Sequence, residues 1–143
     1  MDVGSAGRAG VPTDSTAVSI LTGAFPDLVA VYRFGSTVSG LAIAGSDVDL
    51  AVLPARPLAP LARFDAQERI AAALGRSVDL VDLRQASTVM ASQVVTTGIV
   101  LHDARPDERG RFEDYVYGAY ARLNEERRGI LNRVAAEGTV YGR

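Results

Sequence analysis

The chain has 143 residues, of which 48% are hydrophobic, and its formal net charge at pH 7 is −2. This length and apolar fraction predict one domain with a core of its own. The chain has no cysteine, and every basic residue is arginine, which excludes disulfides, thiolate catalysis, cysteine-ligated zinc and lysine Schiff-base chemistry.

The sequence contains no apolar run long enough to span a bilayer. Residues 1–12 are rich in Gly, Ala and Ser and have no apolar stretch of signal-peptide length. We therefore expect a flexible leader over 1–12, a single domain over 13–143, a cytoplasmic location and no membrane contact. No basic stripe marks a nucleic-acid surface, so direct nucleic-acid binding is not expected.

Apolar spacing and turn residues divide the chain into alternating helices and strands. In chain order, the predicted elements are a helix over 18–25 capped by Thr13, Asp14 or Ser15, a strand over 28–34, a loop over 35–45, a strand over 47–53, a helix over 57–74 with Gly75 as its C-terminal cap, a strand over 78–83, a helix over 86–97, a short edge strand over 99–102, and a long helix from Pro106 to near Gly138. This order is typical of a small α/β or α+β domain, with helices packed on one face of a mixed sheet.

The most informative segment carries two aspartates, Asp47 and Asp49, separated by Val48 alone. Residues two apart on a strand point to the same face, so both carboxylates project together. Adjacent carboxylates repel each other, and a cation between them relieves the repulsion. Mg²⁺ prefers oxygen ligands of this kind and is commonly held by one or two carboxylates together with substrate phosphates.

Gly35 and Ser36 follow the first predicted strand, upstream of the two aspartates. Glycine lets a backbone N–H approach a phosphate closely, and the serine hydroxyl adds a donor. The order strand, small-residue loop and metal-binding strand predicts that a triphosphate and a metal ion share one site.

A third carboxylate is needed to complete a two-metal site and to orient an attacking hydroxyl. The strand over 78–83 offers Asp79 and Asp82, which face opposite sides because they are three residues apart. If Val78 and Leu80 pack on the helices, Asp79 faces the metal site and Asp82 lies on the core side or at the strand end. We therefore select Asp79.

The Gly35-Ser36 pair, followed after ten residues by Asp47-Val48-Asp49, resembles the Gly-Ser…Asp-x-Asp signature of the DNA polymerase beta nucleotidyltransferase superfamily. The short chain, the strand over 78–83 and the closing residues 138–142 resemble its minimal branch, the MNT antitoxins that pair with HEPN-domain toxins. The resemblance covers residues 28–83 well and the C-terminal helix and tail more loosely.

The resemblance implies a polymerase-beta-like fold and a protein adenylyltransferase. Asp47, Asp49 and Asp79 would bind two Mg²⁺ ions, Asp79 would also activate the acceptor hydroxyl, and Gly35 and Ser36 would hold the β- and γ-phosphates of ATP. The hydroxyl, by this resemblance a tyrosine of a cognate HEPN RNase toxin, would attack the α-phosphorus and release pyrophosphate. AMP transfer would silence the toxin.

One departure concerns the loop after Gly35-Ser36, which often carries Arg or Lys in relatives. Here residues 37–44 have no charge, so either the affinity for the triphosphate is weaker or an arginine from elsewhere substitutes, with Arg33 and Arg76 as candidates. Two alternatives stay open: an antitoxin that masks its partner without catalysis, and transfer to a small molecule such as an aminoglycoside.

The C-terminal helix carries Tyr115, Tyr117 and Tyr120 around its circumference, so at least one should be exposed. Tyrosines beside arginines are typical of protein interfaces, although a solvated charged face explains the same pattern.

Overall fold

The computed structural model describes residues 11–35 and 47–140 of the chain. Helices and strands alternate along these residues, as the apolar spacing predicts. Their bounds are Val11–Ala24 (α2), Ala30–Phe34 (β1), Val48–Leu53 (β2), Pro60–Leu74 (α4), Val78–Asp82 (β3), Thr88–Thr97 (α5), Ile99–Asp103 (β4) and Pro106–Val140 (α6).

The four described strands form one mixed sheet in the order β3-β2-β1-β4. Strand β1 is antiparallel to both of its neighbours, β2 and β4, whereas β2 and β3 run parallel. Helix α4 provides the crossover connection that parallel neighbours require. The prediction of a short edge strand after Gly98 is confirmed, because β4 lies at the end of the sheet.

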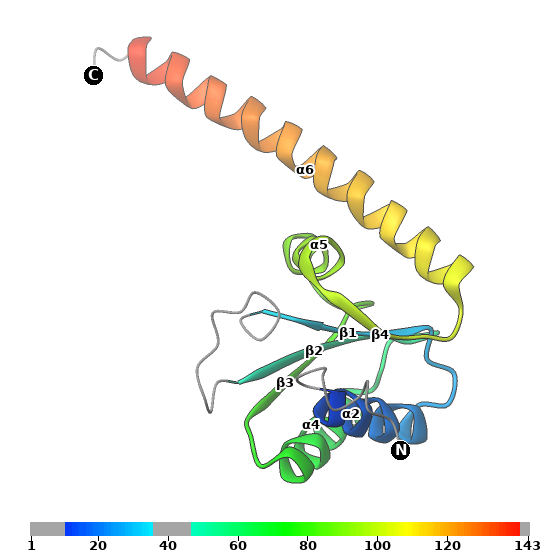
Figure 1. Ribbon diagram of the computed structural model, residues 1–143. Helices are drawn as coiled ribbons and strands as arrows, with labels where there is room; N and C mark the ends of the chain where they lie inside the picture. Colours follow the sequence, from blue (N-terminus) through cyan, green and yellow to red (C-terminus); the bar gives the residue numbers. More distant parts are fainter. Residues whose placement is uncertain (1–10, 36–46, 141–143) are drawn as a thin grey trace.

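Helices cover both faces of the sheet (Figure 1). Helices α2 and α4 pack on one face, and α5 with the first part of α6 packs on the other. In β2, Val48 and Leu50 belong to the first core, whereas Ala51 and Leu53 belong to the second. The expectation of helices on one face is therefore wrong, because the central strands bury side chains on both sides and each side needs its own cover.

The ends of two helices test the capping predictions. Helix α2 begins at Val11, so the last two residues of the expected leader are helical, and residues 1–10 lie outside the described residues. Asp14, one of the expected caps, lies in the first turn and accepts a hydrogen bond from Arg33 at 3.0 Å. Helix α4 ends as predicted, with Gly75 in the left-handed conformation at φ 65°.

The first turns of α6 are tied to the sheet by a chain of polar contacts that runs from the buried Tyr32 to the exposed Asp103. The Tyr32 hydroxyl donates to Glu113 at 2.7 Å, Glu113 also accepts from Arg109 at 2.9 Å, and Arg109 contacts Asp103 at 3.0 Å. Burial, followed by the Glu113 carboxylate, raises the pKa of the Tyr32 phenol, which keeps it a donor. These bonds fix the start of α6 against β1 and β4.

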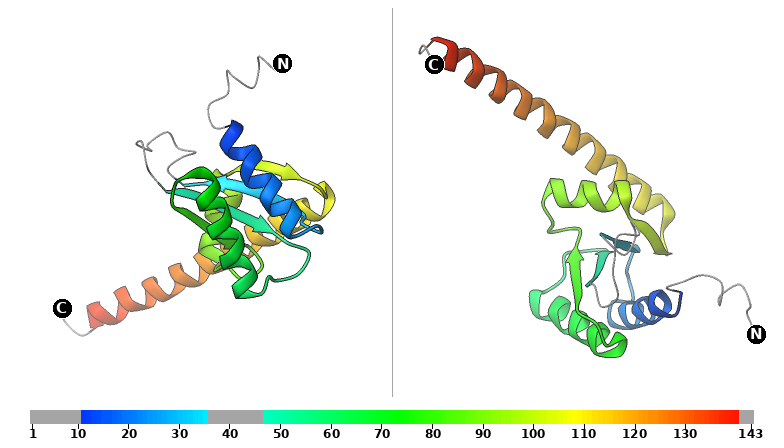
Figure 2. Two further views of the ribbon diagram at one scale, coloured as in Figure 1. Left: turned by 90° about the horizontal axis from the view of Figure 1, so that it is seen from below. Right: turned by 60° about the vertical axis from the view of Figure 1, so that its left-hand side comes forward.

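The rest of α6 extends away from the sheet and from α5 (Figures 1 and 2). Over residues 11–35 and 47–140, no helix combines the length and the apolar character that crossing a membrane requires.

Candidate active site

Three aspartates lie at or just before the starts of β2 and β3. Asp49 is directly paired with Asp79 in the parallel register of these strands, so both side chains lie on the same face of the sheet. Asp47 immediately precedes β2 and is exposed, as is Asp79, whereas Asp49 is half-buried. We call Asp47, Asp49 and Asp79 the carboxylate trio.

The packing of their neighbours explains this orientation. Val48 and Leu50 flank Asp49 and lie in the core under α2 and α4, and Val78 and Leu80 flank Asp79 in the same core. Because side chains alternate along a strand, both aspartates must face the other side of the sheet. The structure thus places Asp79 beside Asp49, as the alternation of apolar residues predicts.

The electrostatics of Asp49 show that the charges of Asp79 and Asp47 act on this carboxylate. Burial, then the charge of Asp79, then that of Asp47 raise the pKa of the Asp49 carboxyl above its ordinary value. A half-buried carboxylate with two like charges near it is stabilised by a bound cation, and such perturbed groups concentrate at functional sites.

Gly35 lies against the carboxylate of Asp49 at the end of β1. Its φ is 81°, and a Cβ added at this position would collide with the Asp49 carboxylate, with Cγ at 3.0 Å. Only glycine combines this backbone conformation with so close an approach. The predicted phosphate-binding glycine is therefore adjacent to the trio, whereas Ser36 lies outside the described residues.

Asp82 has different surroundings from Asp79, although both belong to β3. Its side chain is only 4% exposed. Its carboxylate accepts hydrogen bonds from the backbone of Leu58 at 2.8 Å and of Arg84 at 2.9 Å, and from the Gln85 amide at 2.7 Å. Asp82 thus joins the chain segments around the end of β3, as expected for a structural residue.

The two arginines considered for the triphosphate differ in their position relative to the trio: Arg33 lies on the opposite face of the sheet, whereas Arg76 lies near the end of the sheet where β3 begins. Arg33 pairs with Leu50 across β1 and β2, so its side chain lies on the face opposite Asp49, where Asp14 binds it. Arg76 lies in the turn between α4 and β3, two residues before the strand begins. Residues 37–44, the uncharged loop, lie outside the described residues.

Within the described ranges, no three His, Cys, Asp or Glu side chains converge closely enough to hold a metal ion alone. The donor set nevertheless fits Mg²⁺, because this ion keeps several waters and takes its remaining ligands from one or two carboxylates and from substrate phosphates. Asp49 and Asp79, which are paired in register, could provide these two carboxylates. A cation bound between them would relieve their repulsion.

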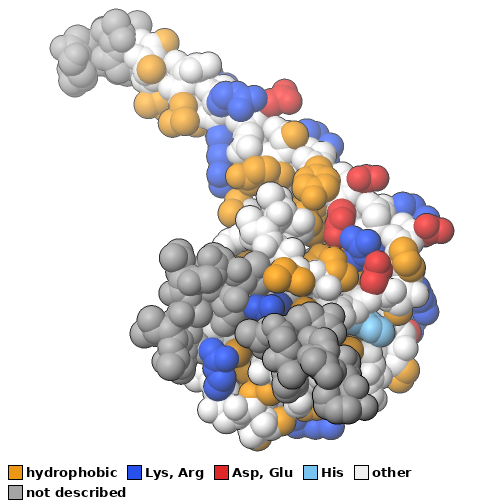
Figure 3. Space-filling model, in the orientation of Figure 1, with side chains coloured by type: hydrophobic (Ala, Val, Ile, Leu, Met, Phe, Trp, Pro, Cys, Tyr) orange, Lys and Arg blue, Asp and Glu red, His pale blue; other side chains and the backbone are white. Residues whose placement is uncertain are grey.

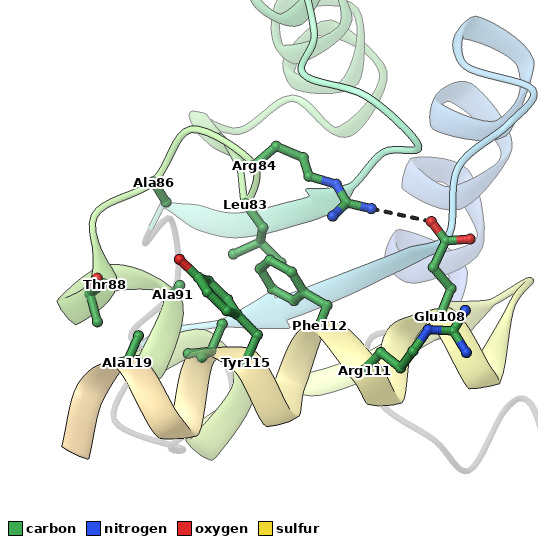
Figure 4. A pocket seen from close by; sticks show the side chains of 11 residues that line it. Leu83, Arg84, Ala86, Thr88, Ala91, Glu108, Arg111, Phe112, Tyr115 and Ala119 are labelled. Carbon is green, nitrogen blue, oxygen red and sulfur yellow. Dashed lines mark hydrogen bonds and ion pairs between the residues drawn. The ribbon is translucent and has the colours of Figure 1, made fainter. Parts of the chain in front are cut away.

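Sequence reasoning missed a cavity of about 440 Å³ between α5 and α6 (Figure 4). Phe112, Val116 and Tyr115 of α6 line one side, and Ala91 of α5 lies opposite. Arg84 closes one end, with its guanidinium 5.5 Å from the centre of the Phe112 ring and 3.3 Å from Glu108. No local sequence pattern predicts this cavity, because the residues that line it come from separate elements of the fold.

Comparison with known proteins identifies the family. The family model described as polymerase beta, nucleotidyltransferase matches residues 18–107, a stretch that contains the whole carboxylate trio. The chain belongs to this nucleotidyltransferase family.

Among curated proteins, the chain is 40% identical over 119 residues to the protein adenylyltransferase MntA of Shewanella oneidensis, covering 83% of this chain and 85% of the relative. Among solved structures, a toxin–antitoxin complex with AMP-PNP matches with a TM-score of 0.77 and 38% identity, over 85% of this chain and 97% of the other. The complex of an MNT antitoxin with the tri-AMPylated HEPN toxin of Shewanella oneidensis matches with a TM-score of 0.73 and 35% identity, over 86% of this chain and 96% of the other.

These likenesses extend well beyond the nucleotidyltransferase motif. They cover 85% and 86% of the chain, more than the residues 18–107 that the family model matches. The polymerase-beta-like fold expected from the motif spacing is confirmed.

Proposed function

We propose that this nucleotidyltransferase is an antitoxin that transfers AMP from ATP to a hydroxyl, by preference a tyrosine, of a cognate HEPN-domain toxin. The observation that carries the proposal is the register of Asp49 with Asp79, with Asp47 close enough to raise the pKa of Asp49. The similarity to an adenylyltransferase and to complexes with an AMPylated HEPN toxin supports the choice of nucleotide and acceptor.

In this proposal Asp47, Asp49 and Asp79 hold two Mg²⁺ ions, and Gly35 and Ser36 hold the β- and γ-phosphates. The bound ions would neutralise the charge that develops on the phosphates. Asp79 is the exposed member on β3, so an acceptor can reach it from solvent, and it takes the proton of the attacking hydroxyl. The tyrosine oxygen then forms a bond to the α-phosphorus as the bond to pyrophosphate breaks.

The single domain over 13–143 carries the whole reaction in this proposal, and ATP and Mg²⁺ come from the cytoplasm. The close approach of Gly35 to Asp49 supports a phosphate-binding turn next to metal-binding carboxylates. This proximity is what a nucleotide bound through both its phosphates and its metal ions requires.

The test is incubation of the chain with labelled ATP, Mg²⁺ and the HEPN-domain partner. We expect label on the partner, and its loss on replacing Asp47→Asn or Asp79→Asn. Tight binding without transfer by the wild type would overturn catalysis and favour an antitoxin that only masks its partner. Transfer to small hydroxyl acceptors, with none to the protein, would favour an aminoglycoside-type enzyme.

A further inference from the structure

Helix α6 consists of a packed half and a projecting half. In the packed half, Val116 is buried in the core under α5, Phe112 packs against that core, and Tyr120 lines a shallow cavity with residues of α5. Beyond Tyr120 the helix extends past the sheet and past α5 (Figures 1 and 2). We call residues 121–136 the projecting arm.

The apolar stripe of the packed half continues along the projecting arm at the same helical phase. Leu123 and Ile130 follow Val116 at successive intervals of seven residues, and Val134 lies one turn after Ile130. Residues seven apart on a helix share a face, so the stripe that packs on the domain continues where the domain has ended. Ile130 is 50% exposed and Val134 is 58% exposed.

Exposing the apolar side chains of Ile130 and Val134 to water is energetically unfavourable. An exposed apolar stripe at helical spacing marks a site where a second helix packs, because removing apolar side chains from water lowers the free energy. Figure 3 shows the hydrophobic side chains along the projecting arm, with arginines beside them. The pattern of apolar stripe and charged flanks is that of a helix that pairs with another helix.

The charges of the arm indicate the chemistry of that second helix. Residues 121–136 contain four arginines and two glutamates, a net charge of +2, whereas the whole chain has a net charge of −2. Two copies of the arm would bring like charges together, whereas an amphipathic helix with acidic flanks is complementary.

We propose that the projecting arm docks an acid-flanked amphipathic helix of the protein that accepts AMP; this inference rests on the proposed function. The arm extends toward the side of the molecule where β1 ends and β2 begins (Figure 1), the end of the sheet that carries the carboxylate trio. A partner held by the arm is thus presented to the reaction site without contacts to the sheet itself.

The test compares two double variants of equal charge. Ile130→Glu with Val134→Glu places two carboxylates in the stripe, and Ala121→Glu with Asn132→Glu places two on the opposite, exposed side of the arm. Calorimetric titration with the HEPN-domain partner should show about a hundredfold weaker binding for the first variant and near-wild-type binding for the second. Both should keep the wild-type melting temperature, because neither pair belongs to a core.

Two outcomes would count against the proposal, and a separate variant tests the proposed function. Equal affinities of both double variants for the partner would overturn the docking arm, even if AMP transfer proceeds. A change from dimer to monomer in the stripe variant, with partner affinity unchanged, would show that a second copy covers the stripe and would also overturn it. Asp47→Asn reports separately on the proposed function, since it should abolish transfer while leaving partner affinity unchanged.

Discussion

The two aspartates of β3 lie three residues apart and have opposite surroundings. Asp82 is buried and accepts three hydrogen bonds, so its charge is fully compensated. Asp79 is exposed, lies beside Asp49 in register and raises the pKa of that carboxyl. A carboxylate whose charge is compensated by hydrogen bonds stabilises the fold, whereas carboxylates that repel each other lower its stability. This difference separates a structural residue from a functional one.

The largest effect that this comparison predicts is on catalysis. Replacing Asp49→Asn should lower AMP transfer by about a thousandfold, because it removes a metal-binding charge from the developing transition state. The rate of label transfer at saturating ATP and Mg²⁺ measures this. Asp65→Asn, an exposed aspartate of α4, is the matched control and should keep the wild-type rate. Equal rates for the two variants would remove Asp49 from the mechanism.

The complementary effect is on stability. Replacing Asp82→Ala should lower the free energy of unfolding by about 3 kcal/mol, because it leaves buried donors without an acceptor. Replacing Asp79→Ala should change it by no more than about 0.5 kcal/mol. Urea unfolding followed by circular dichroism measures both. A larger loss for Asp79→Ala than for Asp82→Ala would reverse the assignment of the two residues.

Two glycines extend the comparison to the backbone. Gly35 and Gly75 both have positive φ, but a Cβ at Gly75 meets nothing within 4 Å, whereas one at Gly35 meets Asp49. Both alanine variants should lose about 1–2 kcal/mol of stability from backbone strain. Only Gly35→Ala should also lower AMP transfer, by about a hundredfold, because it displaces Asp49. Unchanged transfer in folded Gly35→Ala would show that this contact is not required.

The smallest effect is the dependence of stability on pH. Because the pKa of Asp49 is raised in the folded state, the folded chain binds this proton more tightly than the unfolded chain does. The contribution of Asp49 to the free energy of unfolding is therefore present at acid pH and lost as the pH rises through the raised pKa. Relative to the Asp49→Asn variant, the wild type should therefore lose free energy of unfolding as the pH rises through the raised pKa of Asp49.

Urea unfolding at a series of pH values, without Mg²⁺ or ATP, measures that difference. Asp14 also has a raised pKa, owing chiefly to burial, and its contribution cancels because both proteins retain it. A wild type that gains stability over the variant as the pH rises would contradict the repulsion inferred for the trio.

Local patterns were sufficient for several features of this protein. The alternation of apolar residues around Asp49 and Asp79 determines which way each side chain points once a strand forms, because the period of a strand is two. The spacing of Gly35 and Asp47-Val48-Asp49 indicated the family, and Gly75 ended its helix as predicted. These features depend on residues that are near one another in the chain.

Only the tertiary structure decided which strands are neighbours and in what register. The pairing of Asp49 with Asp79 depends on α4 crossing from β2 to β3, and the cover on both faces depends on where α5 and α6 pack. Likewise, Arg33 binds Asp14 on the face of the sheet opposite Asp49. The projecting half of α6 can be recognised only from the structure, which shows where the helix extends beyond the sheet and α5. The physical reason is that these contacts join residues far apart in sequence, and the energy of packing whole elements selects them.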